Sequence, residues 1–257
     1  MKEFFGFGGY EREPEGFLSW QHLLFVSSLM AVMALLAVLL GRRNRSRTER
    51  EKNRVLVICA ILIDSIEIIK LACFCLRSGS CETLLYNLPL FLCSIQLITI
   101  PLAAFSKGRA REAALDFVFI FGLLGAVLGT YGAGQNYSAY PVLGIENTAS
   151  GITHSIAGFC SIYIGVSRMA SMNRRNIPVT FSIMIFFCAA AFAANKLLDY
   201  NYMFLVRGDG TPYDLLYGLV SGSPVLYPLL VVLLLLVYIA VFYLVFFLIK
   251  KCRKVRA

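Results

Sequence analysis

The chain has few charged residues, no metal-binding pattern and none of the common motifs of soluble enzymes. Only 15% of its 257 residues are charged, against about 25% in an ordinary soluble domain. Its eight cysteines include no CxxC pair, so we expect no metal site. No Walker loop, HExxH or GxSxG sequence is present, so ATPase, zinc-protease and serine-hydrolase functions are unsupported. We expect no cofactor.

Apolar residues, by contrast, make up 58% of the chain and are concentrated in long runs. About 20 apolar residues suffice to cross a bilayer as a helix. A soluble domain, a nucleic-acid-binding module and a disordered chain are therefore excluded. We predict an all-α integral membrane protein, with seven transmembrane helices in one domain over residues 1–257. The predicted spans are 17–40, 55–76, 88–105, 113–132, 149–169, 177–198 and 224–249.

Lysine and arginine are distributed unevenly between the two sides of this bundle. Eighteen of them lie after spans one, three, five and seven, and four lie on the other side. The positive-inside rule then predicts an external amino terminus and a cytoplasmic carboxyl terminus in a multi-pass protein of the cell membrane. The first stretch lacks a basic region and a cleavage site and is expected to be a retained span. The basic charge is an orientation signal, so we expect no nucleic-acid partner.

Two reactive side chains are predicted at matching depths in different spans. If Asn87 caps span three, Cys93 lies six residues, or about 9 Å, inside the helix. If Asn147 or Thr148 caps span five, His154 lies at the same level. A thiol beside an imidazole is the minimal pair for covalent acyl transfer, since the histidine takes the proton and the thiolate attacks a carbonyl. The alternative is that both residues only pack between helices.

Other polar residues gather in the same predicted outer half of the membrane. Gln96 shares a helix face with Cys93, and Asn201 follows span six; either is expected to orient the histidine or stabilise an oxyanion. His22, near the outer end of span one, is interpreted as a supporting residue or as part of an interfacial aromatic belt. Span two carries three charged residues on one stripe, Asp64, Glu67 and Lys70. This stripe is interpreted as a structural ion pair or as a transport pathway.

Two segments resemble the YwaF-like bacterial membrane proteins, which are related to eukaryotic transmembrane protein 164. Residues 87–96 read NLPLFLCSIQ and are similar to the LPLHLCNI signature of that family. Residues 201–205 read NYMFL and are followed by Pro212, similar to the family's NYMFL segment before the last span. His22 and His154 fall where the family carries histidines. The resemblance covers nearly the whole chain and includes the seven-span plan.

The resemblance implies a phospholipid acyltransferase whose substrates are a membrane phospholipid and a lysophospholipid. The resemblance further implies, from the eukaryotic branch of that family, that the motif cysteine carries an acyl thioester with the span-five histidine as its partner, roles that fall on Cys93 and His154. The chain departs from the pattern at Phe91, where histidine is frequent, and at residues 221–227, where a Trp-Pro-Trp-Tyr-like run is expected. Ether-lipid specificity is therefore not carried over.

Two other functions stay open. A hydrolase would use the same cysteine and histidine with water as the acceptor. A transporter of a small solute or lipid would be built around the charged stripe of span two, with Glu67 as its central residue.

The residues that we expect to bind substrate or support the reacting pair are Glu67, His22, Gln96 and Asn201. A disulfide between Cys75 and Cys81 would form if their loop faced an oxidising space.

Overall fold

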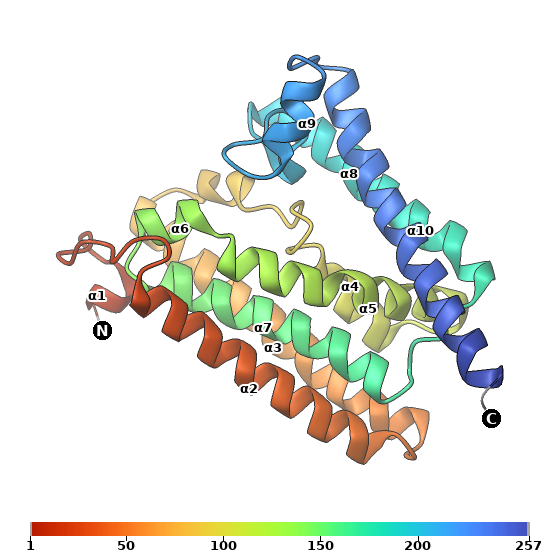
Figure 1. Ribbon diagram of the computed structural model, residues 1–257. Coiled ribbons are helices and arrows are strands. Elements are labelled where there is room, and N and C mark those ends of the chain that lie inside the picture. Colours follow the sequence, from red (N-terminus) through yellow and green to blue (C-terminus); the bar gives the residue numbers. More distant parts are fainter. Residues whose placement is uncertain (1, 256–257) are drawn as a thin grey trace. The chain divides into compact units, whose positions relative to one another are not determined.

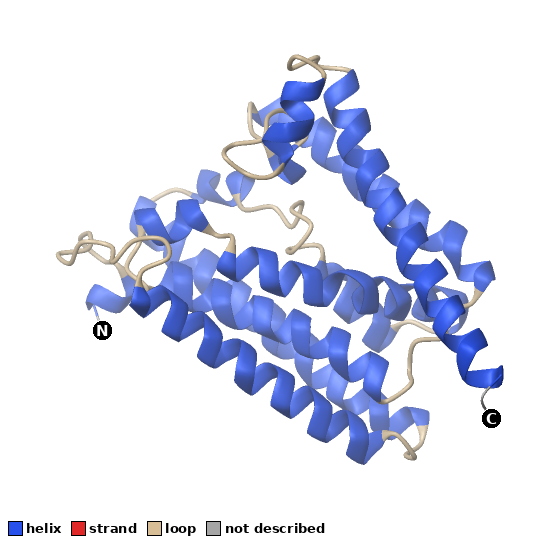
Figure 2. Ribbon diagram, in the orientation of Figure 1, coloured by secondary structure: helices blue, strands red, loops and turns tan. Residues whose placement is uncertain are grey.

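The computed structural model describes residues 2–255, and every regular element in that range is a helix (Figure 2). The described chain divides into two compact units. The first contains the chain up to Asn87 together with Gln96–Ser171, and the second contains Leu88–Ile95 and the chain from Met172 onward. The short segment that carries Cys93 therefore belongs to the second unit, although the first unit surrounds it in sequence. The prediction of one domain over residues 1–257, of which 1, 256 and 257 lie outside the described range, stays a prediction.

The first unit is a bundle of long helices (Figure 1). Within it α5 and α7 lie side by side, α2 and α3 pack on α7, and α4 packs on α3 and α5. Its elements are α1 (Lys2–Phe5), α2 (Trp20–Asn44), α3 (Glu49–Ser78), η1 (Cys81–Tyr86), α4 (Gln96–Phe105), α5 (Gly108–Tyr131), α6 (Gly134–Ala139) and α7 (Ile145–Val166).

Small residues let α5 and α7 approach closely. A Cβ atom on Gly122 of α5 would lie 2.5 Å from the Ala157 carbonyl oxygen, and one on Gly158 of α7 would lie 2.8 Å from the Ala126 Cβ. Helices in lipid have no hydrophobic drive to associate with one another. Glycine and alanine at such crossings allow the close backbone packing that holds the helices together instead. The α5–α7 pair is therefore the tightly packed centre of the first unit.

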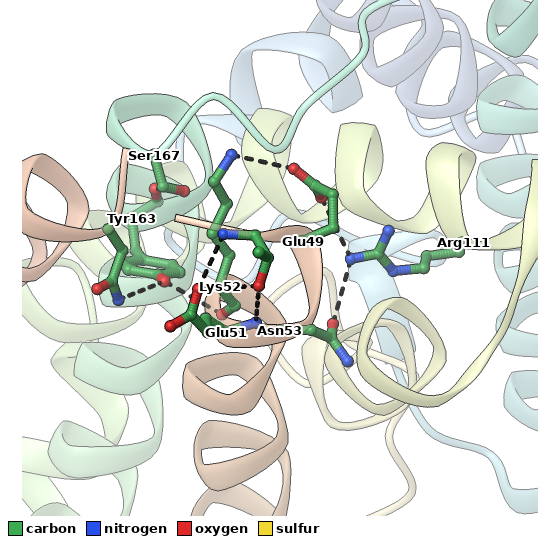
Figure 3. A network of polar contacts seen from close by, with 9 residues as sticks. Glu49, Glu51, Lys52, Asn53, Arg111, Tyr163 and Ser167 are labelled. Atoms are coloured by element: carbon green, nitrogen blue, oxygen red, sulfur yellow. Dashed lines mark hydrogen bonds and ion pairs between the residues drawn. The ribbon is translucent and has the colours of Figure 1, made fainter. Parts of the chain in front are cut away.

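Side chains from four helices form a polar network at the end of the first unit where α2 joins α3 (Figure 3). Tyr163 of α7 donates a hydrogen bond to the Lys52 carbonyl oxygen of α3 at 3.1 Å and accepts one from Asn44 of α2 at 3.0 Å. Glu49 of α3 pairs with Lys52 at 3.0 Å and with Arg111 of α5 at 3.8 Å. The network satisfies the buried Lys52 and Tyr163 and ties the helix ends together.

A buried carboxylate holds the opposite end of the first unit. Glu146, at the start of α7, forms an ion pair with Arg77 of α3 at 2.5 Å and accepts a hydrogen bond from Tyr10. Burial and the Glu146 carboxylate raise the pKa of Tyr10, which keeps its hydroxyl a donor. Burial alone would lower the pKa of Arg77, but its hydrogen bond to Glu146 raises it. One carboxylate thus joins the N-terminal segment, α3 and α7.

The second unit is built on two long helices. Its elements are η2 (Arg174–Asn176), α8 (Ile177–Leu198), η3 (Tyr202–Phe204), α9 (Tyr213–Leu219) and α10 (Leu226–Val255). The helices α8 and α10 pack together, and the Thr180 and Tyr243 hydroxyls hydrogen-bond between them at 3.1 Å. The short elements η3 and α9 connect α8 to α10 and pack on them.

Five helices in the described range are long and apolar enough to cross a membrane. They are α2, α5 extended through α6, α7, α8 extended through η2, and α10. The other two predicted spans differ: α3 has 30 residues but carries the charged stripe, and α4 has 10 residues. Ten helical residues rise about 15 Å, half the thickness of the hydrocarbon core. The structure therefore confirms an all-α membrane protein with five candidate spans.

The prediction of one helix over 88–105 is wrong, because α4 begins only at Gln96. Pro89 has no N–H group for a helical hydrogen bond. The Ser94 hydroxyl, moreover, accepts a hydrogen bond from the Phe91 N–H at 3.0 Å, an arrangement that favours a turn over a continuous helix.

We predict that Glu146→Gln destabilises the protein. It leaves Arg77, whose side chain is 21% exposed, beside a neutral amide, and the expected loss is about 2–3 kcal/mol because Arg77 keeps some contact with solvent. Unfolding by SDS in mixed micelles measures the change. Glu82→Gln, at an exposed residue with no ion pair among the described side chains, is the control, with an expected change below about 0.5 kcal/mol. Equal stability of the two variants would contradict the structural role of Glu146.

Candidate functional site

Cys93 lies in a turn, three residues before the first residue of α4. The Ser94 hydroxyl accepts from the Phe91 N–H at 3.0 Å and donates to the Phe91 carbonyl oxygen at 3.1 Å. The Ile95 N–H donates to the same carbonyl oxygen at 3.0 Å. Cys93 is half-buried. Its backbone is therefore held in a turn ahead of α4, contrary to the prediction of a position six residues inside a span.

The Cys93 turn packs against the second of the two segments that carry the family resemblance. The Phe91 ring lies 5.2 Å from that of Tyr202, 5.8 Å from that of Phe204 and 6.3 Å from that of Tyr200. The Leu88 N–H donates to the Tyr202 hydroxyl at 3.1 Å. Two sequence segments more than 100 residues apart thus meet inside the second unit. Phe91, the departure from the family signature, supplies the aromatic side chain of this contact.

His154 lies on α7 of the first unit with its ring orientation fixed. Its Nδ1 is 2.7 Å from the Ser150 carbonyl oxygen and 3.3 Å from the Ser150 hydroxyl. A carbonyl oxygen only accepts, so Nδ1 carries the proton and Nε2 carries the lone pair. Nε2 lies directly over Gly129 of α5, where a Cβ atom would overlap the imidazole. A neutral imidazole held in this way presents Nε2 as the basic atom.

The depth match predicted for Cys93 and His154 rested on caps that the structure does not contain. Asn87 follows η1 and does not begin a helix, and α7 begins at Ile145, ahead of both residues predicted to cap span five. Cys93 therefore precedes its helix, while His154 lies nine residues after Ile145. The two residues also belong to different units. Their roles as a reacting pair remain a prediction.

Gln96 begins α4 and is fully buried. Its Oε1 accepts a hydrogen bond from the Thr99 hydroxyl at 3.1 Å. Its buried Nε2 makes no hydrogen bond within the described part of the chain. Buried amide groups are nearly always hydrogen-bonded, and an exception calls for a functional explanation. The Gln96 amide is therefore available to donate to a substrate oxygen.

Asn201, by contrast, uses its side-chain amide within the fold. Its Nδ2 donates to the Arg207 carbonyl oxygen and to Asp209, both at 2.8 Å. Its Oδ1 accepts from the Val206 N–H at 2.9 Å. The side chain thus organises the loop after η3, and of the two amides predicted to assist the reaction only Gln96 retains N–H groups for a ligand.

His22 is fully buried and uses both ring nitrogens within the fold. Its Nδ1 accepts from the Leu18 N–H at 3.1 Å, its Nε2 donates to the Thr130 carbonyl oxygen at 3.2 Å, and its ring lies 3.8 Å from that of Tyr137. These contacts fix the start of α2 against α5. They leave neither nitrogen of His22 for a substrate.

Glu67 forms an ion pair with Lys70 on the same helix at 2.7 Å, and each side chain is 14% exposed. This is the internal pairing expected for residues three positions apart on one helix. Asp64, one turn earlier on α3, is half-buried. Within the described residues no three His, Cys, Asp or Glu side chains group so as to hold a metal ion.

The sequence reasoning missed four residues that position the reactive groups. Ser150 is four residues before His154 on one helix, a spacing that the sequence displays, whereas the approach of Gly129 required the packing of α5 on α7. Tyr202 contacts the segment that carries Cys93, and Asn195 hydrogen-bonds the Tyr202 backbone. Nothing in the sequence pairs either residue with that segment.

The fold and the site define an all-helical membrane protein that holds a half-buried cysteine in a turn and a histidine with a basic Nε2 on a packed helix. The chain belongs to the TMEM164 family, which it matches over residues 17–246. The match confirms the relation to transmembrane protein 164 without singling out the YwaF-like bacterial branch. Comparison with curated proteins found no match, and comparison with solved structures found none.

We predict that the two histidines are opposite tautomers. His154 carries its proton on Nδ1 and His22 on Nε2. Since the chain has only two histidines, selective ¹⁵N-histidine labelling gives two resolvable imidazoles. Their ¹⁵N chemical shifts at about pH 8, above the ordinary imidazole pKa of ~6.5, report the tautomers. Two identical tautomers would contradict the structure.

Gly129→Ala should alter the spectrum of His154 alone, because the added methyl group displaces its ring. Gly218→Ala is the control, since a Cβ there would have no atom within 4 Å. We expect both ring spectra to be unchanged in that control variant.

Proposed function

We propose that the protein is an integral membrane lipid acyltransferase that moves a fatty acyl chain from a phospholipid to a lysophospholipid through a thioester on Cys93. Membership of the TMEM164 family supports this proposal. The observation that carries it is the 2.7 Å hydrogen bond from His154 Nδ1 to the Ser150 carbonyl oxygen. This bond holds the tautomer whose Nε2 can accept a proton, as a general base requires.

In the first half-reaction His154 Nε2 takes the proton of the Cys93 thiol, and Sγ attacks the carbonyl carbon of the donor ester. The tetrahedral intermediate collapses by breaking the ester C–O bond. The departing lysophospholipid oxygen takes the proton back from the imidazolium, and the acyl group stays on Cys93 as a thioester.

In the second half-reaction the acceptor's hydroxyl group gives its proton to His154 Nε2 and attacks the thioester carbonyl. The C–S bond breaks, the new ester leaves, and the thiolate recovers the proton. The step needs no metal or redox partner, because two ester bonds of similar energy are exchanged. Water in place of the lysophospholipid would turn the same steps into hydrolysis.

Gln96 is proposed to stabilise the oxyanion of both tetrahedral intermediates. Its buried Nε2 has no acceptor among the described residues, so its N–H groups are preorganised and need not break another bond first. Cys93 precedes α4 by three residues, and the positive end of a helix dipole favours a thiolate near the first turn.

We further propose the seven-span topology, with the amino terminus outside the cell membrane and α3 and the segment 88–105 as the additional crossings. The 18 to 4 distribution of lysine and arginine between the two sides supports this orientation. The ion pair between Glu67 and Lys70 lowers the cost of carrying charge through the membrane on α3.

Purified protein incubated with a phospholipid labelled in its acyl chain should form a hydroxylamine-sensitive adduct on Cys93. We expect Cys93→Ala to abolish the adduct and His154→Ala to slow it by about 10²–10⁴-fold. Gln96→Leu should slow it by about 10²-fold, as loss of an oxyanion donor does. Cys73→Ala, at a buried cysteine of α3, is the control.

A full adduct yield on Cys93→Ala would remove the thiol from the reaction. Addition of lysophospholipid separates the two enzymatic functions: a transferase discharges the thioester into a new phospholipid, whereas a hydrolase releases free fatty acid at an unchanged rate. Retained transfer of the label to an acceptor in the absence of any adduct would exclude the thioester route.

The proposed orientation predicts the labelling of two exposed cysteines. Cys81 and Cys252 are both exposed and lie on opposite sides in this topology. In intact cells, a membrane-impermeant maleimide should label a variant that retains only Cys81 and should spare one that retains only Cys252. Permeabilised cells should give equal labelling of both. The reverse pattern would invert the topology.

A further inference from the structure

We infer that Tyr202, held by Asn195, is the positioning residue for Cys93: its hydroxyl and its ring fix the turn that carries the thiol. The role of Cys93 itself rests on the proposed function. The contacts that hold the turn, which we call the clamp, lie within the second unit alone. Its parts are two hydrogen bonds from Asn195, one hydrogen bond to Leu88 and an aromatic contact with Phe91.

Asn195, in the last turn of α8, fixes the backbone of Tyr202 from both sides. Its Oδ1 accepts from the Tyr202 N–H at 2.6 Å, and its Nδ2 donates to the Tyr202 carbonyl oxygen at 3.0 Å. Both residues are at most 4% exposed. A buried bidentate contact of this kind allows its partner one position, because any shift leaves buried backbone groups unsatisfied.

Tyr202 in turn holds the segment 88–95 at two points. Its hydroxyl accepts from the Leu88 N–H at 3.1 Å, and its ring lies 5.2 Å from that of Phe91. Pro89 follows directly and restricts the backbone of Leu88, so the anchored N–H sets the direction of the chain into the turn. Cys93 lies two residues beyond Phe91, inside the turn that Ser94 closes. The clamp therefore acts on both the entry and the middle of this segment.

The backbone next to Tyr202 is strained. Met203 and Phe204 have φ of 54° and 55°, a conformation that side chains other than glycine rarely adopt. Such residues persist only where their surroundings hold them, and they are concentrated at functional sites. Here Phe204 stacks on Tyr213 at 5.5 Å, and the Met203 sulfur lies 3.6 Å from that of Cys188.

Tyr202→Phe tests the clamp, since it removes the hydroxyl and keeps the ring. Without its acceptor the Leu88 N–H is released, and we expect its hydrogen exchange to rise about tenfold or more. The rate of thioester formation on Cys93 should fall by about 10- to 100-fold with KM nearly unchanged, because the thiol is misplaced while lipid binding is intact. Tyr213→Phe is the matched control: its ring belongs to the same cluster, and its hydroxyl makes no hydrogen bond within the described residues.

Asn195→Ala should reproduce the effect of Tyr202→Phe, and the double variant should lose little more, since the two residues act as one unit. The clamp is overturned if Tyr202→Phe leaves either Leu88 exchange or the thioester rate at the level of the unaltered protein, or if Tyr213→Phe gives the same losses. Absence of any thioester in the unaltered protein would instead refute the proposed function. Faster Leu88 exchange in Tyr202→Phe would then still support the clamp.

Discussion

The absence of water from the membrane interior is the constraint on which this structure depends. Helices satisfy their own backbone groups there, whereas a non-helical segment must find partners in side chains. Residues 88–95 form a non-helical segment of this kind of backbone, and Ser94 and Tyr202, the latter held by Asn195, supply side-chain partners for it. The turn frees Cys93 from a helix face and leaves its position to be set by tertiary contacts.

The same constraint explains how His154 is prepared. A histidine on a lipid-buried helix satisfies one nitrogen most simply with the carbonyl oxygen one turn back, here that of Ser150. The ring needs room to turn toward that oxygen, and Gly129 of the neighbouring helix provides it. The close packing of α5 on α7 through Gly122 and Gly158 brings that glycine to the imidazole. The packing of α5 on α7 in the first unit therefore also selects the tautomer of His154.

Several charged side chains hold the fold through ion pairs. Glu146 joins the N-terminal segment to α3 and α7 through Tyr10 and Arg77, and Glu49 links α3 to α5 through Arg111. Glu67 is paired along its own helix with Lys70. These ion pairs already have partners, whereas the N–H groups of the buried Gln96 amide have no acceptor among the described residues. Ligand chemistry is therefore better assigned to Gln96 than to the ion pairs.

The sequence determined the helical membrane class, because long apolar runs permit few other structures in lipid. It also determined the family, and it singled out Cys93, His154 and Gln96, since reactive or polar side chains within such runs are conspicuous. Helix starts were not readable: Asn87 and Asn147 look like caps, yet the first follows η1 and the second lies inside α7. Only the tertiary structure decided that residues 88–95 form a turn, that Asn201 and His22 spend their hydrogen-bonding groups on the fold, and that Tyr202 holds the Cys93 turn. These outcomes depend on groups distant in sequence that compete for the same hydrogen bonds. A local sequence pattern does not show which of these groups will pair.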